Sequence, residues 1–201
     1  MLGLSREDSW KIWRQLCAEK NGEFIEAGFL TRRVETKHGN WTITLEIYSV
    51  GGRGQPLTRL RAPYVNLDKF RFNLSRASIF TKLGAKLGMR DVIIGDSQFD
   101  DAFVTKGNDE NRLRELFSNE KLRTLISVYP NITLAVRDAE LRSDRQFPEG
   151  VDELFLTAAG VISDLNRLRI FFYIVEDTLD QLCRIGSADE STNCLADKSD
   201  S

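Results

Sequence analysis

The chain has 201 residues, of which 41% are hydrophobic and 29% charged, and its formal net charge is −2. These values are typical of one folded domain with an apolar core, and they exclude a strongly basic protein attracted as a whole to nucleic acid or membrane. The longest apolar run, residues 170–175, is far shorter than the roughly 20 residues that cross a bilayer. Because the amino terminus becomes charged at Arg6 without a preceding apolar run, we expect a cytoplasmic protein without a signal peptide.

The amino-terminal segment predicts a short helix. A helix-start box opens at Ser5, and Trp10 and Trp13 then lie on one apolar face. The helix is expected to end at Asn21-Gly22, because these residue types adopt the left-handed backbone that follows many helices. The two tryptophans are interpreted as the surface that docks this helix onto the domain, with a ligand platform as the alternative.

Sheet follows the first helix. Residues 41–50 alternate between apolar and polar side chains, which is typical of a strand with one buried and one wet face. A two-residue turn at His38-Gly39 joins this strand to an earlier one, and "GGRGQP" forms the next hairpin loop. Consecutive short strands joined by turns predict an antiparallel meander. The predicted strands cover residues 33–37, 41–50, 58–62 and 70–75.

The second half mixes short helices and strands. We expect helices at residues 78–89 and 119–129, the second beginning after a break at Ser118-Asn119. Strands are expected at residues 91–96, 132–136 and 154–161.

The strongest helix begins at Ser163, with apolar residues spaced three and four apart. They are Leu165, Leu168, Phe172, Val175, Leu179 and Leu182. This helix is expected to form the centre of the core, with a coiled-coil partner as the alternative. The predicted fold is therefore α+β: an antiparallel β-meander packed with amino-terminal and long carboxy-terminal amphipathic helices. It forms one domain over residues 1–186, followed by a disordered polar tail over residues 187–201.

The stretch "FDDAFVTKGNDENRLRELF" carries five carboxylates, four of which lie around its Lys-Gly-Asn turn: Asp100, Asp101, Asp109 and Glu110. A metal or acid–base site is one interpretation, but their spacing does not match a calcium loop. We favour a strand that passes into a helix. Asn108 then caps the helix, and Asp109 and Glu110 lie at the positive end of its dipole.

This stretch also carries a resemblance. Phe99, Phe103, Val104, Gly107 and Asp109 follow a Phe-x-x-x-Phe-x-Val-like strand and a Gly/Ser-x-Asp helix start. With "RLRAPYVN", "FRFNL" and the long final helix, the chain resembles an uncharacterised bacterial family of unknown function over residues 10–186. The family carries no assigned activity. Some of its members have transmembrane segments, which are not found in this sequence.

Residues for catalysis are few. His38, the sole histidine, falls in a predicted turn with no nucleophile near it in sequence. Cys17 and Cys183 lie on apolar helix faces and are expected to be inert, and Cys194 lies in the tail. No phosphate loop is present, and we expect no cofactor and no metal site. A hydrolase-like enzyme with a carboxylate and arginine site remains the alternative.

Basic residues concentrate between residues 53 and 90, with one acid, Asp68, among them, and acids dominate residues 91–120. One interpretation is a surface that binds an anionic partner, either an acidic protein or a membrane; nucleic acid is disfavoured because no aromatic residues interleave the basic ones on the side expected to be exposed. The alternative is a solvated sheet face whose arginines pair with the acids that follow. The candidate binding residues are Arg59, Arg61, Arg71, Lys82, Lys86 and Arg90.

Overall fold

The computed structural model describes residues 6–27, 31–49, 54–77, 90–138 and 147–190. The strands are β1 (Glu23–Ala27), β2 (Thr31–His38), β3 (Trp41–Ser49), β4 (Pro56–Asn66), β5 (Phe72–Arg76), β6 (Arg90–Val92), β7 (Phe103–Gly107), β8 (Ile132–Asp138), β9 (Val151–Ala159) and β10 (Ala188–Asp189). The helices are α1 (Arg6–Glu19), α2 (Ser97–Ala102), α3 (Glu110–Leu116), α4 (Glu120–Val128) and α5 (Leu165–Arg184).

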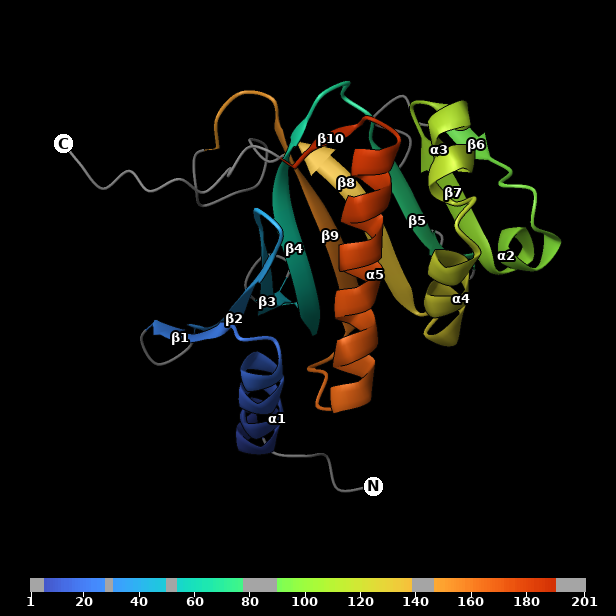
Figure 1. Cartoon of the computed structure of the whole chain (residues 1–201). Coiled ribbons are helices and arrows are strands. Elements are labelled where there is room, and N and C mark those ends of the chain that lie inside the picture. Colours follow the sequence, from blue (N-terminus) through green and yellow to red (C-terminus); the bar gives the residue numbers. More distant parts are fainter. Residues whose placement is uncertain (1–5, 28–30, 50–53, 78–89, 139–146, 191–201) are drawn as a thin grey trace.

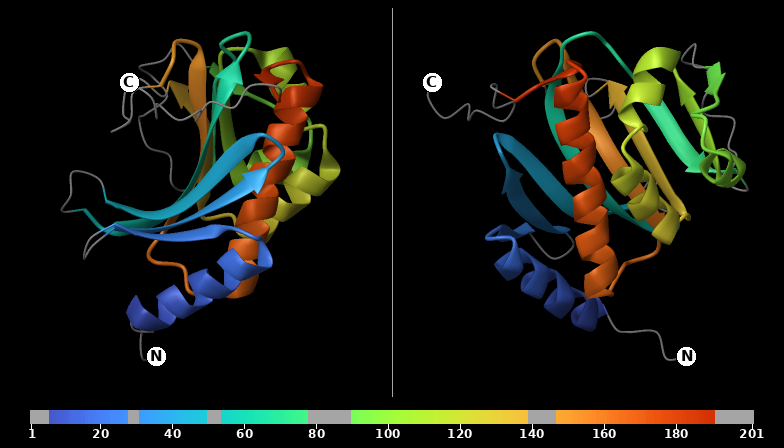
Figure 2. Two further views of the ribbon diagram at one scale, coloured as in Figure 1. Left: turned by 60° about the vertical axis from the view of Figure 1, so that its left-hand side comes forward. Right: turned by 45° about the vertical axis from the view of Figure 1, so that its right-hand side comes forward.

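The strands form one antiparallel sheet in the order β1-β2-β3-β4-β9-β8-β5-β7-β6, with β10 paired to the end of β4. The helices of the described part lie together on one side of this strongly twisted sheet (Figures 1 and 2). The predicted α+β class and antiparallel sheet are confirmed. The predicted meander holds through β4 and then stops, because the chain crosses the ends of β9 and β8 before it enters β5.

Helix α5 forms the centre of the core, as its apolar spacing predicts. Phe172 and Leu179 are fully buried between α5 and the sheet, whose inward residues include Leu60 and Leu156. Helix α1 docks beside it, and the Trp13 indole Nε1 donates a 2.9 Å hydrogen bond to the Ile162 carbonyl. In the described part of the chain, no helix is long and apolar enough to cross a membrane.

Residues 99–117 fold as α2, β7 and α3, and helix and loop chemistry explains three of the four acids around the turn. Asp100 accepts hydrogen bonds from the backbone amides of Ile94 and Gly95. The predicted cap of α3 is wrong by one residue. Asp109 is the cap and accepts from the Arg112 amide, which leaves Glu110 in the first turn.

Two further predictions need correction at the residue level. The hairpin turn between β2 and β3 is Gly39-Asn40, not His38-Gly39, because His38 pairs with Trp41 and Gly39 has the positive φ of 55°. The segment predicted as a disordered tail begins with ordered residues: Ser187 is buried, and β10 pairs with β4. The predicted helix at residues 78–89 and the tail from residue 191 lie outside the described residues.

Candidate functional site

One face of the sheet lies opposite α5, and no helix of the described part covers it (Figure 2). Side chains alternate along a strand, so Arg59 and Arg61 point to this face while Leu60 between them points to the core. We call this surface the charged face. Its charged residues on β2, β3, β4, β8 and β9 are Arg33, Glu35, Lys37, Glu46, Arg59, Arg61, Arg137 and Glu153.

The arginines of the charged face are held by neighbouring strands. The Arg59 guanidinium pairs with Glu46 on β3 and lies 4.1 Å from the centre of the Tyr48 ring. Arg61 bridges two strands, because its Nε lies 2.9 Å from a Glu46 oxygen and its Nη1 donates to Glu153 on β9 at 3.2 Å. These contacts fix each guanidinium in one position on the sheet.

Burial and charge act in opposite directions on Arg61, whose side chain is 12% exposed. Burial alone would lower the pKa of this guanidinium, but the carboxylates of Glu46 and Glu153 outweigh burial and raise it. The side chains of both glutamates are themselves 17% exposed. The result is a mostly buried ion triple in which the Arg61 guanidinium stays protonated.

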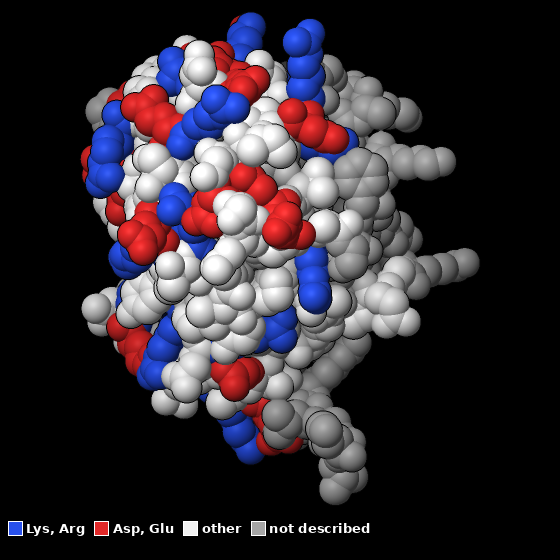
Figure 3. All heavy atoms as spheres, turned by 90° about the vertical axis from the view of Figure 1, so that its right-hand side faces the viewer, with Lys and Arg blue, Asp and Glu red and all other residues white. Residues whose placement is uncertain are grey.

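The acids that neutralise these arginines are not the predicted ones. The alternative interpretation paired them with residues 91–120, whereas Glu46 and Glu153 lie outside that segment. Acids within the segment pair with bases close to them, as Asp91 does with Lys106 and Glu110 with Arg114. Figure 3 shows the side of the molecule that carries α3 and β6, where basic and acidic side chains are interspersed.

The other candidate residues do not join Arg59 and Arg61. Arg71 precedes β5, which is separated from β4 by β9 and β8. Arg90 is exposed on the edge strand β6. Lys82 and Lys86 lie outside the described residues. The structure therefore brings together two of the six candidates, and their role in binding stays a prediction.

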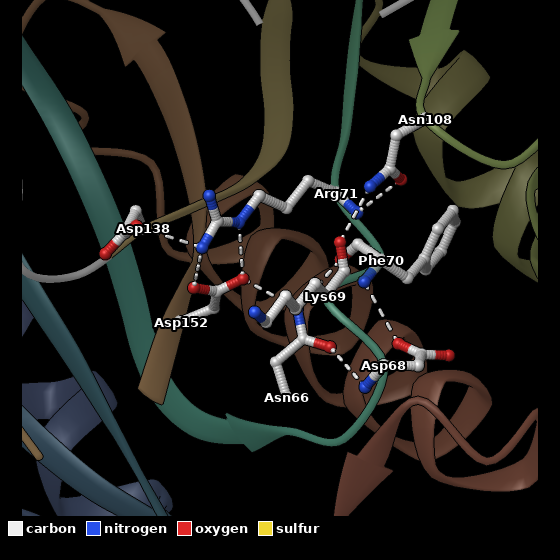
Figure 4. Close-up of polar contacts among 8 residues, drawn as sticks. All are labelled: Asn66, Asp68, Lys69, Phe70, Arg71, Asn108, Asp138 and Asp152. Carbon is white, nitrogen blue, oxygen red and sulfur yellow. Dashed lines mark hydrogen bonds and ion pairs between the residues drawn. The ribbon is translucent and has the colours of Figure 1, made fainter. Parts of the chain in front are cut away.

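Arg71 lies at the centre of a polar network where the chain crosses the sheet (Figure 4). Its Nε and Nη2 each donate to Asp152 at 2.8 Å, and Nη2 also donates to Asp138 at 3.0 Å. Asn66 donates to the same Asp152 carboxylate at 2.6 Å and to the Phe70 carbonyl at 2.9 Å. The hydrogen bonds to Asp152 are the largest cause of the raised pKa of Arg71.

This network has a structural explanation. The five residues between β4 and β5 must pass over the ends of β9 and β8, and Asp152 and Asp138 stand at those two ends. Asn108, which was predicted to cap α3, instead accepts from the Arg71 amide and donates to the Lys69 carbonyl. Lys69 has a positive φ of 59°, which marks a tight turn in the crossing segment. The network therefore fixes the crossing.

The same network is the place where carboxylates and an arginine converge, as a hydrolase-like site would require. Each carboxylate oxygen of Asp152 is already bonded to Arg71. A surface recess at the carboxyl end of α5 has none of these residues in its wall. No group of three or more metal-binding side chains occurs among the described residues. The convergence of Asp138 and Asp152 on Arg71 is therefore explained by the crossing of the chain over the sheet.

The recess has a volume of about 410 Å³ and lies at the carboxyl end of α5. Its lining residues come from the β2–β3 turn, the start of the crossing segment, α5 and β10: Asn40, Leu67, Cys183, Ala188, Asp189 and Glu190. His38 lies one residue before the turn and bonds to Asp180 of α5 at 2.7 Å. This pair ties the hairpin to α5.

Comparison with known proteins finds a solved structure with a similar fold. No model of a protein family and no curated protein matches the chain. The crystal structure of the mycobacterial trehalose monomycolate transport factor A, TtfA, is similar in structure, with a TM-score of 0.56 over 89% of this chain and 96% of that chain. The two sequences are 9% identical. The likeness therefore establishes a shared fold.

Proposed function

We propose that this chain is a non-catalytic binding domain that presents its charged face to another protein. The observation that carries the proposal is the fixed geometry of Arg59 and Arg61, which Glu46, Glu153 and the Tyr48 ring hold in place. Side chains that are already ordered lose little conformational entropy when a partner binds, so a preorganised surface favours association.

The composition of the charged face supports a protein partner. Arginine and aromatic residues dominate the energetics of protein interfaces, and both occur here in contact, as Arg59 with Tyr48 and Arg137 with Phe155. Acidic and basic residues alternate across the strands, from Arg33 to Glu46 to Arg59. A lipid headgroup layer or nucleic acid selects a surface of one sign, whereas alternating charges select a partner with a matching pattern.

The structural neighbour TtfA is named as a transport factor, and its likeness to this chain supports the fold. The basic sequence segment predicts an acidic partner, but Arg59 and Arg61 are paired with glutamates, so we propose instead a partner whose acidic and basic groups match this pattern.

Photo-crosslinking in the native cell tests the proposal. A benzoylphenylalanine replaces Tyr48 on the charged face, and the matched control replaces Tyr173, which lies on α5 on the opposite side of the sheet and is 46% exposed. We expect one defined protein adduct from position 48 that is absent from position 173 and is lost when Arg59→Glu is added. Equal adducts at both positions, or none at position 48, contradict the proposal.

Binding to anionic vesicles distinguishes the membrane alternative. If the charged face contacts lipid, the protein cosediments with phosphatidylserine vesicles at low salt and Arg59→Glu abolishes this. Our proposal expects no cosedimentation above that of neutral vesicles. Arg71→Glu is unsuited to this test, because it breaks the internal network around Asp152.

A further inference from the structure

The charged face keeps open hydrogen-bonding positions although its arginines are paired within the chain. Arg59 donates from Nε and Nη2, and both bonds go to one oxygen of Glu46, Oε1. Arg61 also lies against this oxygen and donates to Oε1 of Glu153. Among the described residues, Nη1 of Arg59 and the second carboxylate oxygens of Glu46 and Glu153 therefore have no partner, and each of these atoms reaches solvent.

Two cross-strand pairs on β3 and β4 have the composition that a two-fold contact requires. Glu46 on β3 lies beside Arg59 on β4, and Tyr48 on β3 lies beside Leu57 on β4. A two-fold axis that runs along these strands and between them places each β3 residue of one copy opposite the β4 residue of the same row in the other copy. Glu46 then faces Arg59, and Tyr48 faces Leu57, each twice. Sheets that pack face to face keep their strands within about 30° of each other, which this axis satisfies.

A further pair of opposite charges meets in the same arrangement, one strand further from the axis. Lys37 on β2 pairs with Thr42 on β3, and Glu153 on β9 pairs with Pro63 on β4. Thr42 and Pro63 each lie two residues beyond the last pair that joins β3 to β4, so they belong to one row. The axis therefore places Lys37 of one copy opposite Glu153 of the other. Lys37 is exposed, and its ammonium donates to the Thr42 hydroxyl at 2.7 Å.

The same axis brings no like charges of these rows face to face. The other charged residues on β2 and β4, which are Arg33, Glu35 and Arg61, face Thr157, Phe155 and Thr44 respectively. Like charges that oppose each other across an interface cost several kcal/mol, so most surfaces with this many charges are not self-complementary.

We infer that the protein bound by the charged face is a second copy of this chain, in a two-fold dimer whose axis lies between β3 and β4. The inference rests on the proposed function and names its partner. In this dimer Nη1 of Arg59 and the second oxygen of Glu46 form ion pairs between the copies, and the bonds within each chain are kept. A two-fold dimer is the commonest oligomer and needs a single self-complementary surface.

Sedimentation equilibrium of the full chain over a wide range of concentration tests the inference. We expect a monomer–dimer equilibrium whose dissociation constant rises with salt. Lys37→Glu places two carboxylates opposite each other and should raise this constant at least about fivefold. The matched control is Lys11→Glu on α1, where the side chain is 79% exposed, and it should leave the constant unchanged.

Reversal of both members of the central pair distinguishes a second copy from any other protein. In Glu46→Arg/Arg59→Glu, the pair within the chain and the pair between copies both keep opposite charges. This variant should dimerise with a dissociation constant within about threefold of the original, whereas Arg59→Glu alone should weaken the dimer at least about tenfold. In a mixture, the original chain and the double variant should each dimerise with themselves, because a mixed dimer opposes like charges. A partner of different sequence would lose the double variant as well as the single one.

The photo-crosslink from position 48 separates failure of this inference from failure of the proposed function. An adduct of twice the mass of the chain supports both. A chain that is monomeric at every concentration and crosslinks to a different protein overturns the dimer and leaves the proposed function standing. A monomer without any adduct contradicts both. A dimer that forms equally well with Lys37→Glu and Arg59→Glu also overturns the inference, because it must use another surface.

Discussion

Asp152 is the residue whose removal tests the structural account of the crossing segment most severely. Its side chain is 4% exposed and accepts two hydrogen bonds from Arg71 and one from Asn66. Replacing Asp152 with alanine leaves the Arg71 guanidinium with Asp138 as its carboxylate partner in this network. It also removes the shorter of the two hydrogen bonds that the Asn66 side-chain amide donates. Loss of one partner of a buried pair costs about 3–5 kcal/mol, and because Arg71 is itself 25% exposed, we expect the lower value, about 3 kcal/mol.

Urea denaturation measures this effect. With a slope of about 2–3 kcal/mol/M, Asp152→Ala should lower the unfolding midpoint by about 1–1.5 M. The matched control, Asp138→Ala, removes the hydrogen bond from Arg71 to a carboxylate that is 26% exposed and should cost about 1 kcal/mol. The double variant Arg71→Ala/Asp152→Ala should lose much less free energy of unfolding than the two single variants lose together, because each single change already removes the same ion pair. A loss for Asp152→Ala no larger than that of the control would refute the reasoning.

Three further outcomes follow from the structure. Phe172→Ala should lower the free energy of unfolding by about 4 kcal/mol in the same urea assay, because Phe172 is fully buried; a loss below about 1 kcal/mol contradicts its central position. The Phe99 amide hydrogen bond lowers the pKa of Asp96 below 3.8, so its contribution to stability is present above pH 3.8 and is lost as the pH falls through the folded value. Asp96→Asn should flatten that decline in acid unfolding curves, and an unchanged decline would exclude this carboxyl as its source. Burial raises the pKa of Cys17, so iodoacetamide should modify Cys183 before Cys17, as followed by mass spectrometry. Faster labelling of Cys17 than of Cys183 would show that α1 detaches.

Local chemistry made much of the fold predictable. The apolar spacing of residues 165–182 identified α5 and its buried face, and alternation over residues 41–50 identified β3. The break at Ser118-Asn119 was also predicted correctly, since Asn119 caps α4. Each of these features depends on residues that are close together in the sequence, so periodicity and capping residues are enough to predict it.

The sheet order and the polar partners were not predictable in the same way. Arg71 lies 81 positions from Asp152, and nothing in a single sequence shows that β9 and β8 insert between β4 and β5. Arg71 was therefore grouped with Arg59 and Arg61. The sequence did indicate Glu46 as a possible partner of Arg59 and Arg61, because it falls on the solvent-facing side of a predicted strand. Neighbouring side chains decided the cap of α3: Asn108 bonds to the crossing segment, which leaves the cap to Asp109.

The measurement that tests the central claim most directly is the affinity of the crosslinked partner for two charge-reversed variants. Arg59→Glu alters the charged face, and Arg169→Glu makes the same change on α5, where the arginine pairs with Glu19. Thermal unfolding of each variant is measured to check that both remain folded. We predict that Arg59→Glu weakens binding at least tenfold, about 1.4 kcal/mol, while Arg169→Glu leaves it unchanged. Equal affinities of the two variants, or a larger loss for Arg169→Glu, would contradict a partner bound to the charged face.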